Sequence, residues 1–526
     1  CVQKMNALKR SVRNGMVRFG VPLALGVMVA LTTKHALSNF THVDHASKDQ
    51  YGIVIDAGSS GSRVYLYSWN CGQRTRLDDP EVFDSKTKPI DLSLMTDNRN
   101  KSKNLVLKVS PGLSSFAGHA DDAIKSLEPL IKFAERHIPK DKHHTSPLYV
   151  LATAGLRLLP DNDQQDLVQS LRQQLPRLTP FDIQPSSVQI LSGSKEGVYG
   201  WASVNHVLRK YNTNQRDGDG TVGCLDMGGG SAQIAYEVAA GTKPPQNVGS
   251  VIKFLFDDSF ETHYVYVSTL PGFGTNEARN RYIDAHTRQQ GVWLDPCLNL
   301  GQSRLWKPRP DSFNAFVPKK RTLIGSGNFS KCLENVVSLI DTSPNGCEAT
   351  LDAPCSFAQL KFPPARSQAP WYGVSEYWYT SHDVFDIGGT YNSARFRKTA
   401  QSFCGQTWTK LLTKFDSGDY PDAQLSRFES QCFKAAWMEA MLHSGYKFPV
   451  KDKFITVSKI HGIDAQSWTL GAVLDLAQSV QCVPTSTWTF QIHLAVWIVP
   501  MLAGFSAAFL YSVITGEPVV KTLVRG

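Results

Sequence analysis

Several common ligand-binding patterns are missing from this sequence of 526 residues. It contains no G-x-x-x-x-G-K-[ST] loop, which excludes the P-loop nucleotide hydrolases. It has no G-x-G-x-x-G ahead of a helical pattern, so a dinucleotide-binding fold is not indicated. Paired C-x-x-C spacings are also missing, which disfavours a structural zinc site.

Little net positive charge is carried by the body of the chain. The formal net charge is +9. The segment after Ile514 carries +1, and the first 18 residues carry +5 with no acidic residue among them. Only +3 is left for everything between. This distribution argues against nucleic acid as the partner.

Long uncharged runs occur only near the two ends. A hydrophobic content of 42% is enough for a large core, which a chain of this length divides between at least two lobes. Residues 489–514 are predicted to be a transmembrane helix. The uncharged run 19–33 is shorter, but it extends to a predicted transmembrane helix at 19–37 if Lys34 reaches the membrane surface. A cleaved signal peptide is the alternative for residues 19–37. Small residues in that segment would also permit helix association, and hence a homo-oligomer.

The flanks of these two segments predict how the chain is oriented in a lipid bilayer. Basic residues lie on the outer side of both, in 1–18 and 515–526, so both tails are expected in the cytosol. The residues between the two segments, 38–488, would then be lumenal or extracellular.

The cysteines fit an oxidising compartment. Proximity in the sequence favours three disulfides in the second half, although other pairings remain open: Cys297 with Cys332, Cys347 with Cys355, and Cys404 with Cys432. Cys71 and Cys224 are expected to be unpaired, the latter inside a buried strand. The sequons at Asn39, Asn100 and Asn328 would be glycosylated in such a compartment.

Strand and helix patterns alternate between the two apolar segments, which predicts an α/β fold. Residues 121–138 place Ile124, Leu127, Ile131 and Ala134 on one helical face. A strand is expected directly afterwards, from residue 148 to 153. Residues 78–103 and 212–220 are polar and are predicted to be exposed loops.

Two similar turns stand about 170 residues apart: DAGSSGSR at 56–63 and DMGGGSAQ at 226–233. Each follows an apolar strand pattern and precedes another. Glycines let backbone N–H groups approach an anion, and serine hydroxyls add donors. An aspartate at the strand end can hold a metal ion through water. One such turn is equally typical of a β-hairpin, but two at matching positions predict that two lobes grip phosphates and a cation.

The chain resembles the nucleoside triphosphate diphosphohydrolases, the apyrase family. Five regions carry the resemblance in order: IVIDAGSSGSR (53–63), LATAGLRLL (151–159), LSGSKEGVYGWASVN (191–205), LDMGGGSAQIA (225–235) and SWTLGAVL (467–474). The resemblance implies two RNase H-like lobes, as in actin and the heat-shock-chaperone ATPases, with the active site in the cleft between them. It implies lobe I at 48–190, completed by 450–482, and lobe II at 191–449.

Glu196 is the predicted catalytic base. It lies in a loop that enters a helical pattern with Val198, Trp201 and Leu208 on one face. From the residues alone, an acidic group there could merely complement the helix dipole. The family resemblance assigns this glutamate to water activation, which suits a carboxylate.

The resemblance also implies the rest of the site, with Ca²⁺ or Mg²⁺ as the cofactor. Ser231 and Gln233 would orient the attacking water. The cation would be held through water by Asp56, Asp226, Thr153 and Trp468. The phosphates would be bound by Gly58, Ser59, Ser60, Gly228, Gly229, Gly230 and Thr153.

Four further residues stay ambiguous at this stage. Arg63 and Arg157 could each clamp a phosphate oxygen or form a salt bridge within a lobe. Tyr377 or Trp378, in the aromatic-rich segment WYGVSEYWYT, could stack on the nucleobase, although such a strand is more often part of a core.

The predicted function is hydrolysis of nucleoside triphosphates or diphosphates to the monophosphate and phosphate. A chaperone-like nucleotide-binding protein or a kinase of the same fold is the alternative. The first motif and the segment GGTYNSARFRKTAQSFC resemble the two-span Golgi and lysosomal apyrases, which favour UDP and related nucleotides. An endomembrane location is therefore favoured over the cell surface.

Overall fold

The computed structural model describes the chain between residues 49 and 476, with gaps. The gaps are residues 71–91, 98–99, 212–219, 244–248, 257–261, 287–290, 307–320, 342–361, 364, 367–368, 449–453, 461–462 and 465–466. Both predicted transmembrane segments, Asn39, Cys71 and the pair Cys347 and Cys355 lie outside the described residues. Within the described ranges, no helix is both long and apolar enough to cross a membrane.

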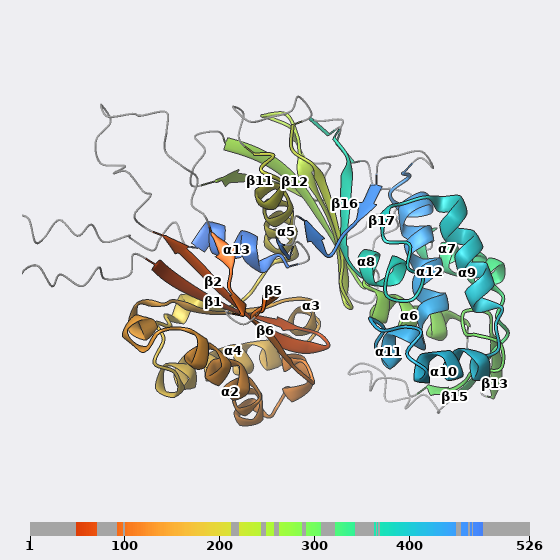
Figure 1. Cartoon of the computed structure of the whole chain (residues 1–526), viewed down its shortest axis with the longest axis horizontal. Helices are drawn as coiled ribbons and strands as arrows, with labels where there is room; N and C mark the ends of the chain where they lie inside the picture. Colours follow the sequence, from red (N-terminus) through yellow and green to blue (C-terminus); the bar gives the residue numbers. More distant parts are fainter. Residues whose placement is uncertain are drawn as a thin grey trace, which may run out of the picture.

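Lobe I is built on a six-stranded sheet in the order β3-β2-β1-β7-β8, with β6 also pairing with β2. β1 and β2 form an antiparallel hairpin, whereas β7 and β8 run parallel to β1. The helices α2 and α4 cover one face (Figure 1). The strands are β1 (Asp49–Gly58), β2 (Gly61–Asn70), β3 (Ser93–Leu94), β6 (Val106–Val109), β7 (Leu148–Ala152) and β8 (Val188–Ile190).

The helices of lobe I confirm the periodicity of the sequence. All four residues of the predicted apolar face are buried on α2. The polar segment 78–103 is not wholly a loop, because β3 joins the sheet edge and buries Leu94. The remaining elements are the helices α2 (Ala120–His137), α3 (Ala154–Arg157) and α4 (Asp161–Leu178), the strands β4 (Thr96–Asp97) and β5 (Asn100–Asn104), and 3₁₀ helices at Leu113–Phe116, Lys140–Thr145 and Pro185–Ser187.

Lobe II repeats the same plan in a seven-stranded sheet of order β11-β12-β10-β9-β16-β18-β17. β9 and β10 form the antiparallel hairpin, and β16 and β18 extend the sheet in parallel from β9. The two halves therefore confirm the duplicated fold. The strands are β9 (Gly223–Met227), β10 (Ser231–Glu237), β11 (Ser250–Leu255), β12 (Thr262–Pro271), β16 (Trp371–Ser375), β17 (Gly389–Thr390) and β18 (Phe454–Thr456).

Two helices, α5 (Gly193–Leu208) and α13 (Thr469–Leu476), fill the space between the two sheets (Figure 1). A hydrophobic core joins both helices to one face of each sheet. Tyr199 on α5 donates a 2.6 Å hydrogen bond to Asp475 on α13. The expected return to lobe I at residue 450 comes later in the structure, because β18 still pairs with the lobe II sheet. The contacts with lobe I that follow are those of β20 (Ile463–Asp464) with β3 and of α13 with β1.

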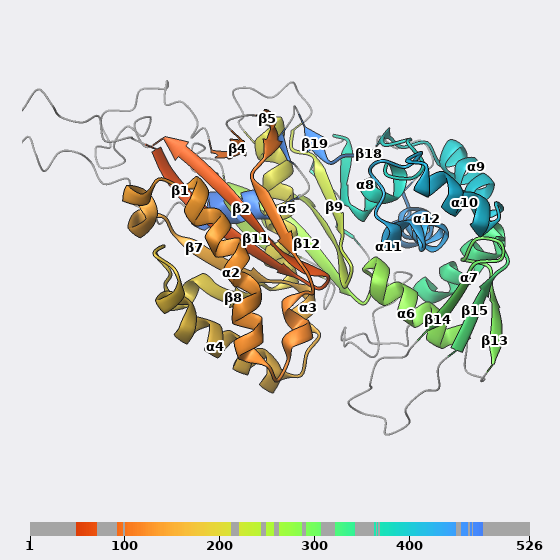
Figure 2. The ribbon, with the colours of Figure 1, turned by 60° about the horizontal axis from the view of Figure 1, so that its bottom comes forward.

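A helical extension with a three-stranded sheet completes lobe II at the end farthest from α4 (Figure 2). Its helices and the outer face of the lobe II sheet enclose the largest core. The elements are α6 (Thr275–His286), β13 (Val292–Asp295), β14 (Ser303–Trp306), β15 (Arg321–Gly325), α7 (Phe329–Asp341), α8 (Glu376–Ser381), α9 (Ser393–Cys404), α10 (Trp408–Asp416), α11 (Leu425–Phe428), α12 (Gln431–Ala440) and a π turn at Met441–Gly445. The small hairpin of β19 (Lys459–Ile460) and β20 lies elsewhere, against α5 and β3.

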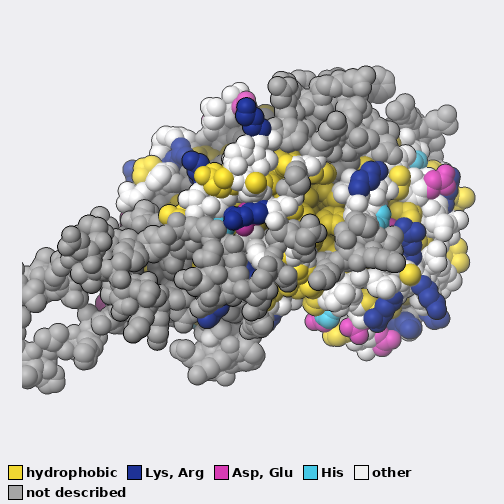
Figure 3. All heavy atoms as spheres, turned by 90° about the horizontal axis from the view of Figure 1, so that it is seen from above, with side chains coloured by type: hydrophobic (Ala, Val, Ile, Leu, Met, Phe, Trp, Pro, Cys, Tyr) yellow, Lys and Arg dark blue, Asp and Glu magenta, His cyan; other side chains and the backbone are white. Residues whose placement is uncertain are grey.

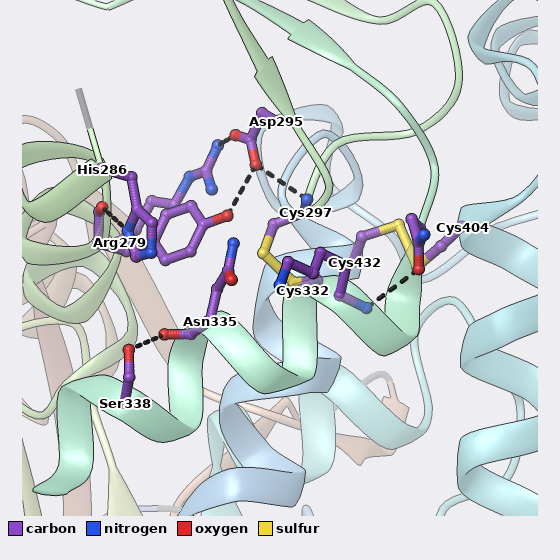
Figure 4. Close-up of a disulfide and its surroundings, with 12 residues drawn as sticks. Arg279, His286, Asp295, Cys297, Cys332, Asn335, Ser338, Cys404 and Cys432 are labelled. Carbon is purple, nitrogen blue, oxygen red and sulfur yellow. Dashed lines mark hydrogen bonds and ion pairs between the residues drawn. A yellow bond between two sulfur atoms is a disulfide. The ribbon is translucent and has the colours of Figure 1, made fainter. Parts of the chain in front are cut away.

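Two of the predicted disulfides are confirmed, and both cross-link elements of this extension. Cys297 is bonded to Cys332, and Cys404 to Cys432, with Cα atoms 4.9 and 5.5 Å apart (Figure 4). Cys224 is a free, buried thiol on β9, as predicted.

The described part of one face carries Lys and Arg as separate groups among neutral and hydrophobic side chains (Figure 3).

Candidate active site

The two glycine- and serine-rich turns meet where the lobes face each other. The first joins β1 to β2, and the second joins β9 to β10. A Cβ atom on Gly229 would lie 3.0 Å from Ser59 Oγ, and one on Gly230 would lie 2.9 Å from Ala154 Cβ. A side chain at Gly230 would therefore press on lobe I, and one at Gly229 would displace the Ser59 hydroxyl and Asn276. The predicted pair of facing turns is therefore present.

A polar cavity of about 490 Å³ lies between the turns. This volume suits a small-molecule ligand. Both lobes contribute to its walls, and twelve of the predicted site residues line it: Asp56, Gly58, Ser59, Ser60, Thr153, Glu196, Asp226, Gly228, Gly229, Gly230, Ser231 and Trp468.

Glu196 is placed by the start of α5. Ser192 caps this helix by accepting a 3.1 Å hydrogen bond from the Lys195 N–H. Glu196 follows in the first turn and is buried, with 8% of the residue exposed. Its Oε2 accepts hydrogen bonds from Arg157 Nη2 at 2.7 Å and Gln233 Nε2 at 3.3 Å. The described residues donate no hydrogen bond to Oε1, so this oxygen is available to a water molecule.

Ser231 and Gln233 belong to the same cluster as Glu196. They occupy positions i and i+2 of β10 and so project from the same side of the strand. Gln233 Nε2 donates a 2.8 Å hydrogen bond to Ser231 Oγ. Ser231 lines the cavity, whereas Gln233 is buried behind it. A water beside Glu196 would thus meet the carboxylate as an acceptor and the Ser231 hydroxyl, whose oxygen is held in place by the hydrogen bond from Gln233.

Asp56 and Asp226 end equivalent strands of the two lobes and are both buried. Burial raises the pKa of Asp56 to about 6, although Arg63 opposes the shift. Burial and the nearby Glu196 raise the pKa of Asp226 to about 7. Asp226 Oδ1 has no hydrogen-bond partner among the described residues.

These observations fit a divalent cation. Two buried carboxylates that resist ionisation, one with an orphaned oxygen, are the kind of hard oxygen donors that Ca²⁺ and Mg²⁺ prefer. Among the described residues, no group of three or more acidic, histidine or cysteine side chains forms a complete metal cage. A cation here would therefore need water and phosphate oxygens to complete its coordination.

Four cationic side chains line the cavity, and three of them, Lys108, Arg427 and Lys434, lie outside the five motifs. Lys108 and Arg63 come from lobe I, and Arg427 and Lys434 from lobe II. Lys434 Nζ lies 2.6 Å from Glu376 Oε2. Although burial opposes the effect, Lys434 and Arg427 lower the pKa of Glu376. The cationic side chains on the cavity wall therefore suit an anionic ligand.

The segment WYGVSEYWYT presents a different aromatic residue from those expected. β16 ends at Ser375, and the following residues form the helix α8 instead of a strand. Helical spacing places Glu376 and Tyr379 on the cavity wall, whereas Tyr377 is 0% exposed in the lobe II core. Trp378 stacks on His382 and does not line the cavity. Arg427 lies over the Tyr379 ring, 3.6 Å from its centroid.

The two arginines left open by the sequence have different surroundings. Arg63 lines the cavity, and its Nη1 lies 3.7 Å from Asp56 Oδ2. Arg157 does not line the cavity and pairs with Glu196. No local motif announces Lys108, Arg427 or Lys434, because each reaches the cavity only through tertiary packing.

The fold and the cavity define a class of protein: two actin-like α/β lobes of the same plan that enclose a polar cavity between paired turns. Residues 42–494 match the model of the GDA1/CD39 (nucleoside phosphatase) family, and the chain belongs to that family. It is therefore a nucleoside phosphatase, and nucleotide hydrolysis is its activity.

Relatives extend over most of the chain. The chain is 34% identical over 447 residues to nucleoside-diphosphatase mig-23 of Caenorhabditis briggsae, covering 81% of this chain and 76% of that protein. It is 33% identical over 477 residues to ectonucleoside triphosphate diphosphohydrolase 4 of Homo sapiens, covering 81% and 72%. The crystal structure of nucleoside triphosphate hydrolases from Neospora caninum matches with a TM-score of 0.55 and 15% identity, covering 85% of this chain and 96% of that one. This last likeness concerns the fold alone.

Proposed function

We propose that the protein hydrolyses nucleoside diphosphates and triphosphates to the monophosphate and inorganic phosphate, with a divalent cation as cofactor. The observation that carries this proposal is the cluster of Glu196, Ser231 and Gln233 beside the facing turns. Glu196 would accept a proton at Oε1 from a water that Ser231 holds in place. That water would attack the terminal phosphorus in line with the leaving oxygen.

The remaining site residues would bind and orient the substrate. The backbone N–H groups of both turns, with Ser59, Ser60 and Thr153, would hold the terminal phosphate. Asp56 and Asp226 would hold Ca²⁺ or Mg²⁺ through water, with Thr153 and Trp468 around those waters. The bound cation would neutralise phosphate charge. The nucleoside would extend toward Tyr379 and Arg427, the aromatic and cationic end of the cavity.

Replacement of the proposed base tests the mechanism. Glu196→Gln keeps the shape of the side chain but cannot accept the proton, so kcat should fall by about a hundred- to ten-thousand-fold. Nucleotide binding, followed by calorimetry, should persist. The matched control is Glu334→Gln, which alters an exposed glutamate on α7 and should leave kcat unchanged. If Glu196→Gln retained a tenth of the wild-type rate, Glu196 would not be the base.

A nucleotide panel distinguishes this proposal from the chaperone-like and kinase alternatives of the same fold. Phosphate release from UDP, GDP, ADP and ATP, measured without any acceptor molecule, should occur with Ca²⁺ or Mg²⁺ and stop in excess chelator. A kinase would need an acceptor, and a binding protein would release phosphate at a negligible rate. Turnover that survives excess chelator would contradict the cation requirement.

We also propose a lumenal position for the catalytic region, with both tails in the cytosol. Support comes from the apolar segments 19–37 and 489–514 and their basic flanks. We favour an endomembrane such as the Golgi and UDP-type substrates. Antibody labelling of cells that have not been permeabilised tests the location, and strong surface labelling would contradict it.

A further inference from the structure

We propose that Arg157 is a positioning residue that fixes the catalytic glutamate from the opposite lobe, so that base orientation depends on how the two lobes are docked. This inference rests on the proposed role of Glu196. Arg157 ends α3, directly after β7 and Thr153 of lobe I. Glu196 is on α5, which packs against β10 and β12 of lobe II, and Ser231 begins β10. Arg157 therefore reaches across the boundary between the lobes.

The guanidinium group is held at both ends. Nη1 donates a 2.7 Å hydrogen bond to the Leu191 carbonyl, just ahead of α5. Nη2 donates to Glu196 Oε2 at 2.7 Å and to Ser231 Oγ at 3.3 Å. Because the guanidinium is planar and its donors have fixed directions, the Leu191 contact sets the angle at which Nη2 meets the carboxylate.

These contacts distinguish positioning from phosphate binding. Arg157 is not part of the cavity wall, and both terminal nitrogens are already bonded to protein oxygens. By occupying Oε2, Arg157 leaves Oε1 as the oxygen that faces water. The 3.3 Å bond from Gln233 is the other contact to Oε2, and it is long for an N–H···O bond. Gln233 alone would hold the carboxylate poorly, because the terminal torsion of glutamate is soft.

Loss of Arg157 should therefore reduce turnover rather than substrate binding. We expect Arg157→Met to lower kcat about ten- to a hundred-fold, the cost of a small misplacement of a reacting group. KM should stay within about threefold, since the phosphate-binding turns are untouched. Arg157→Lys should recover part of kcat, because an ammonium can bond to either Glu196 or Leu191 but lacks the planar fork.

A double variant supplies a readout that a merely structural role would not move. If Arg157 acts only through Glu196, Arg157→Met combined with Glu196→Gln should have the same kcat as Glu196→Gln alone. The control is Arg172→Met. Arg172 is another lobe I arginine that donates to a backbone carbonyl, that of Val188, but lies away from the cavity. This variant should leave kcat unchanged.

The experiment measures kcat and KM for UDP with Mg²⁺ on the full-length protein, together with thermal unfolding and calorimetric nucleotide binding. A large rise in KM at constant kcat would overturn the proposal in favour of a phosphate clamp. Additive losses in the double variant, or a kcat of Arg157→Met near wild type, would also overturn it. If Arg157→Met does not fold, Arg157→Lys decides: a wild-type kcat contradicts the proposal, and a reduced kcat at constant KM supports it. If the wild type itself released no phosphate, the proposed function would fail instead.

Discussion

At the scale of single residues, the site contains buried carboxyl groups, and burial disfavours their ionised form. Asp56 and Asp226 come from different lobes, and burial is the main cause that raises the pKa of each. Glu196 adds repulsion to both, and Asp56 adds repulsion to Asp226. Arg63 is the cation closest to Asp56, at 3.7 Å. In a metal-free protein, burial and the nearby negative charge favour protonation of both aspartates. A divalent cation would favour the ionised form instead.

The raised pKa values of Asp56 and Asp226 predict how the free energy of unfolding depends on pH. In the unfolded chain, the pKa of both aspartates is near 3.8. In the folded protein, the pKa is about 6 for Asp56 and about 7 for Asp226. Between these values the folded state binds more protons than the unfolded state, so the contribution of both groups to the free energy of unfolding falls as pH rises. One pKa unit corresponds to about 1.4 kcal/mol, and we expect a loss of at least this size.

Thermal unfolding in excess chelator tests the prediction. The unfolding temperature of the wild type should fall from pH 5 to pH 7.5 more steeply than that of an Asp56→Asn, Asp226→Asn double variant. Added Ca²⁺ at pH 7.5 should stabilise the wild type and not the double variant. Equal pH slopes for the two proteins would show that these carboxyls are not protonated in the fold.

At the scale of elements, α5 carries Glu196 and is fitted closely between the two sheets. Its glycines do not all have the same role. A Cβ on Gly197 would lie 2.6 Å from Val267 Cγ1 on β12, closer than side chains tolerate. A Cβ on Gly200, less than one turn later, would meet only Cys224 Sγ, at an ordinary 3.8 Å. The contact at Gly197 therefore sets how near Glu196 comes to the lobe II sheet.

These two glycines predict opposite effects of the same substitution. Gly200→Ala should raise the free energy of unfolding by up to about 1 kcal/mol, because alanine favours the helix. Gly197→Ala should lower it by about 1 to 3 kcal/mol through overpacking, and should reduce kcat by shifting the neighbouring Glu196. Urea denaturation and phosphate release measure both effects. A stable, fully active Gly197→Ala variant would contradict the tight packing of α5 on β12.

At the scale of the whole molecule, three hydrophobic cores join the parts into one body. One core lies within lobe I, another within lobe II and its helical extension, and the third is shared through α5 and α13. The disulfides lie in the extension, where Cys404–Cys432 holds the beginning of α12 and Lys434 follows within the first turn. The cationic wall of the cavity is thereby tied to the most strongly cross-linked part of the described chain.

The compartment of this body can be tested at Asn328. This residue is exposed and precedes α7, and its Oδ1 accepts a 3.0 Å hydrogen bond from the Lys331 N–H. A glycan would be joined to Nδ2 and would leave this helix cap intact. If lobe II is lumenal, we expect mass spectrometry of the protein from a secretory host to find a glycan at Asn328.

Two variants separate the glycan from the cap. Ser330→Ala destroys the sequon and keeps Asn328, while Asn328→Asp keeps a capping oxygen and cannot be glycosylated. Both should lose the glycan with little change in unfolding temperature. An unmodified Asn328 in the wild-type protein from such a host would count against a lumenal lobe II.

Much of the fold follows from short stretches of sequence. The helical face of α2, the two strand–turn–strand repeats and the start of α5 are set by local spacing of apolar residues, glycine and serine. The disulfides of Cys297 and Cys404 were also predictable, because in each case the partner is near in the sequence. These features depend on neighbours along the chain, where periodicity carries the information.

Tertiary structure decided which side chains contact the site and which are buried away from it. Whether Arg157 meets a phosphate or Glu196 depends on how α3 of one lobe docks on α5 of the other. Tyr377 and Tyr379 have similar chemistry, yet a change from strand to helix at Ser375 buries one and turns the other toward the cavity. Such outcomes depend on the relative position of segments far apart in the sequence. The sequence by itself determined that two glycine- and serine-rich turns and a carboxylate at a helix start exist in this protein. Only packing between the lobes decided which side chains contact that carboxylate and line the rest of the cavity, because those side chains come from segments far apart in the chain.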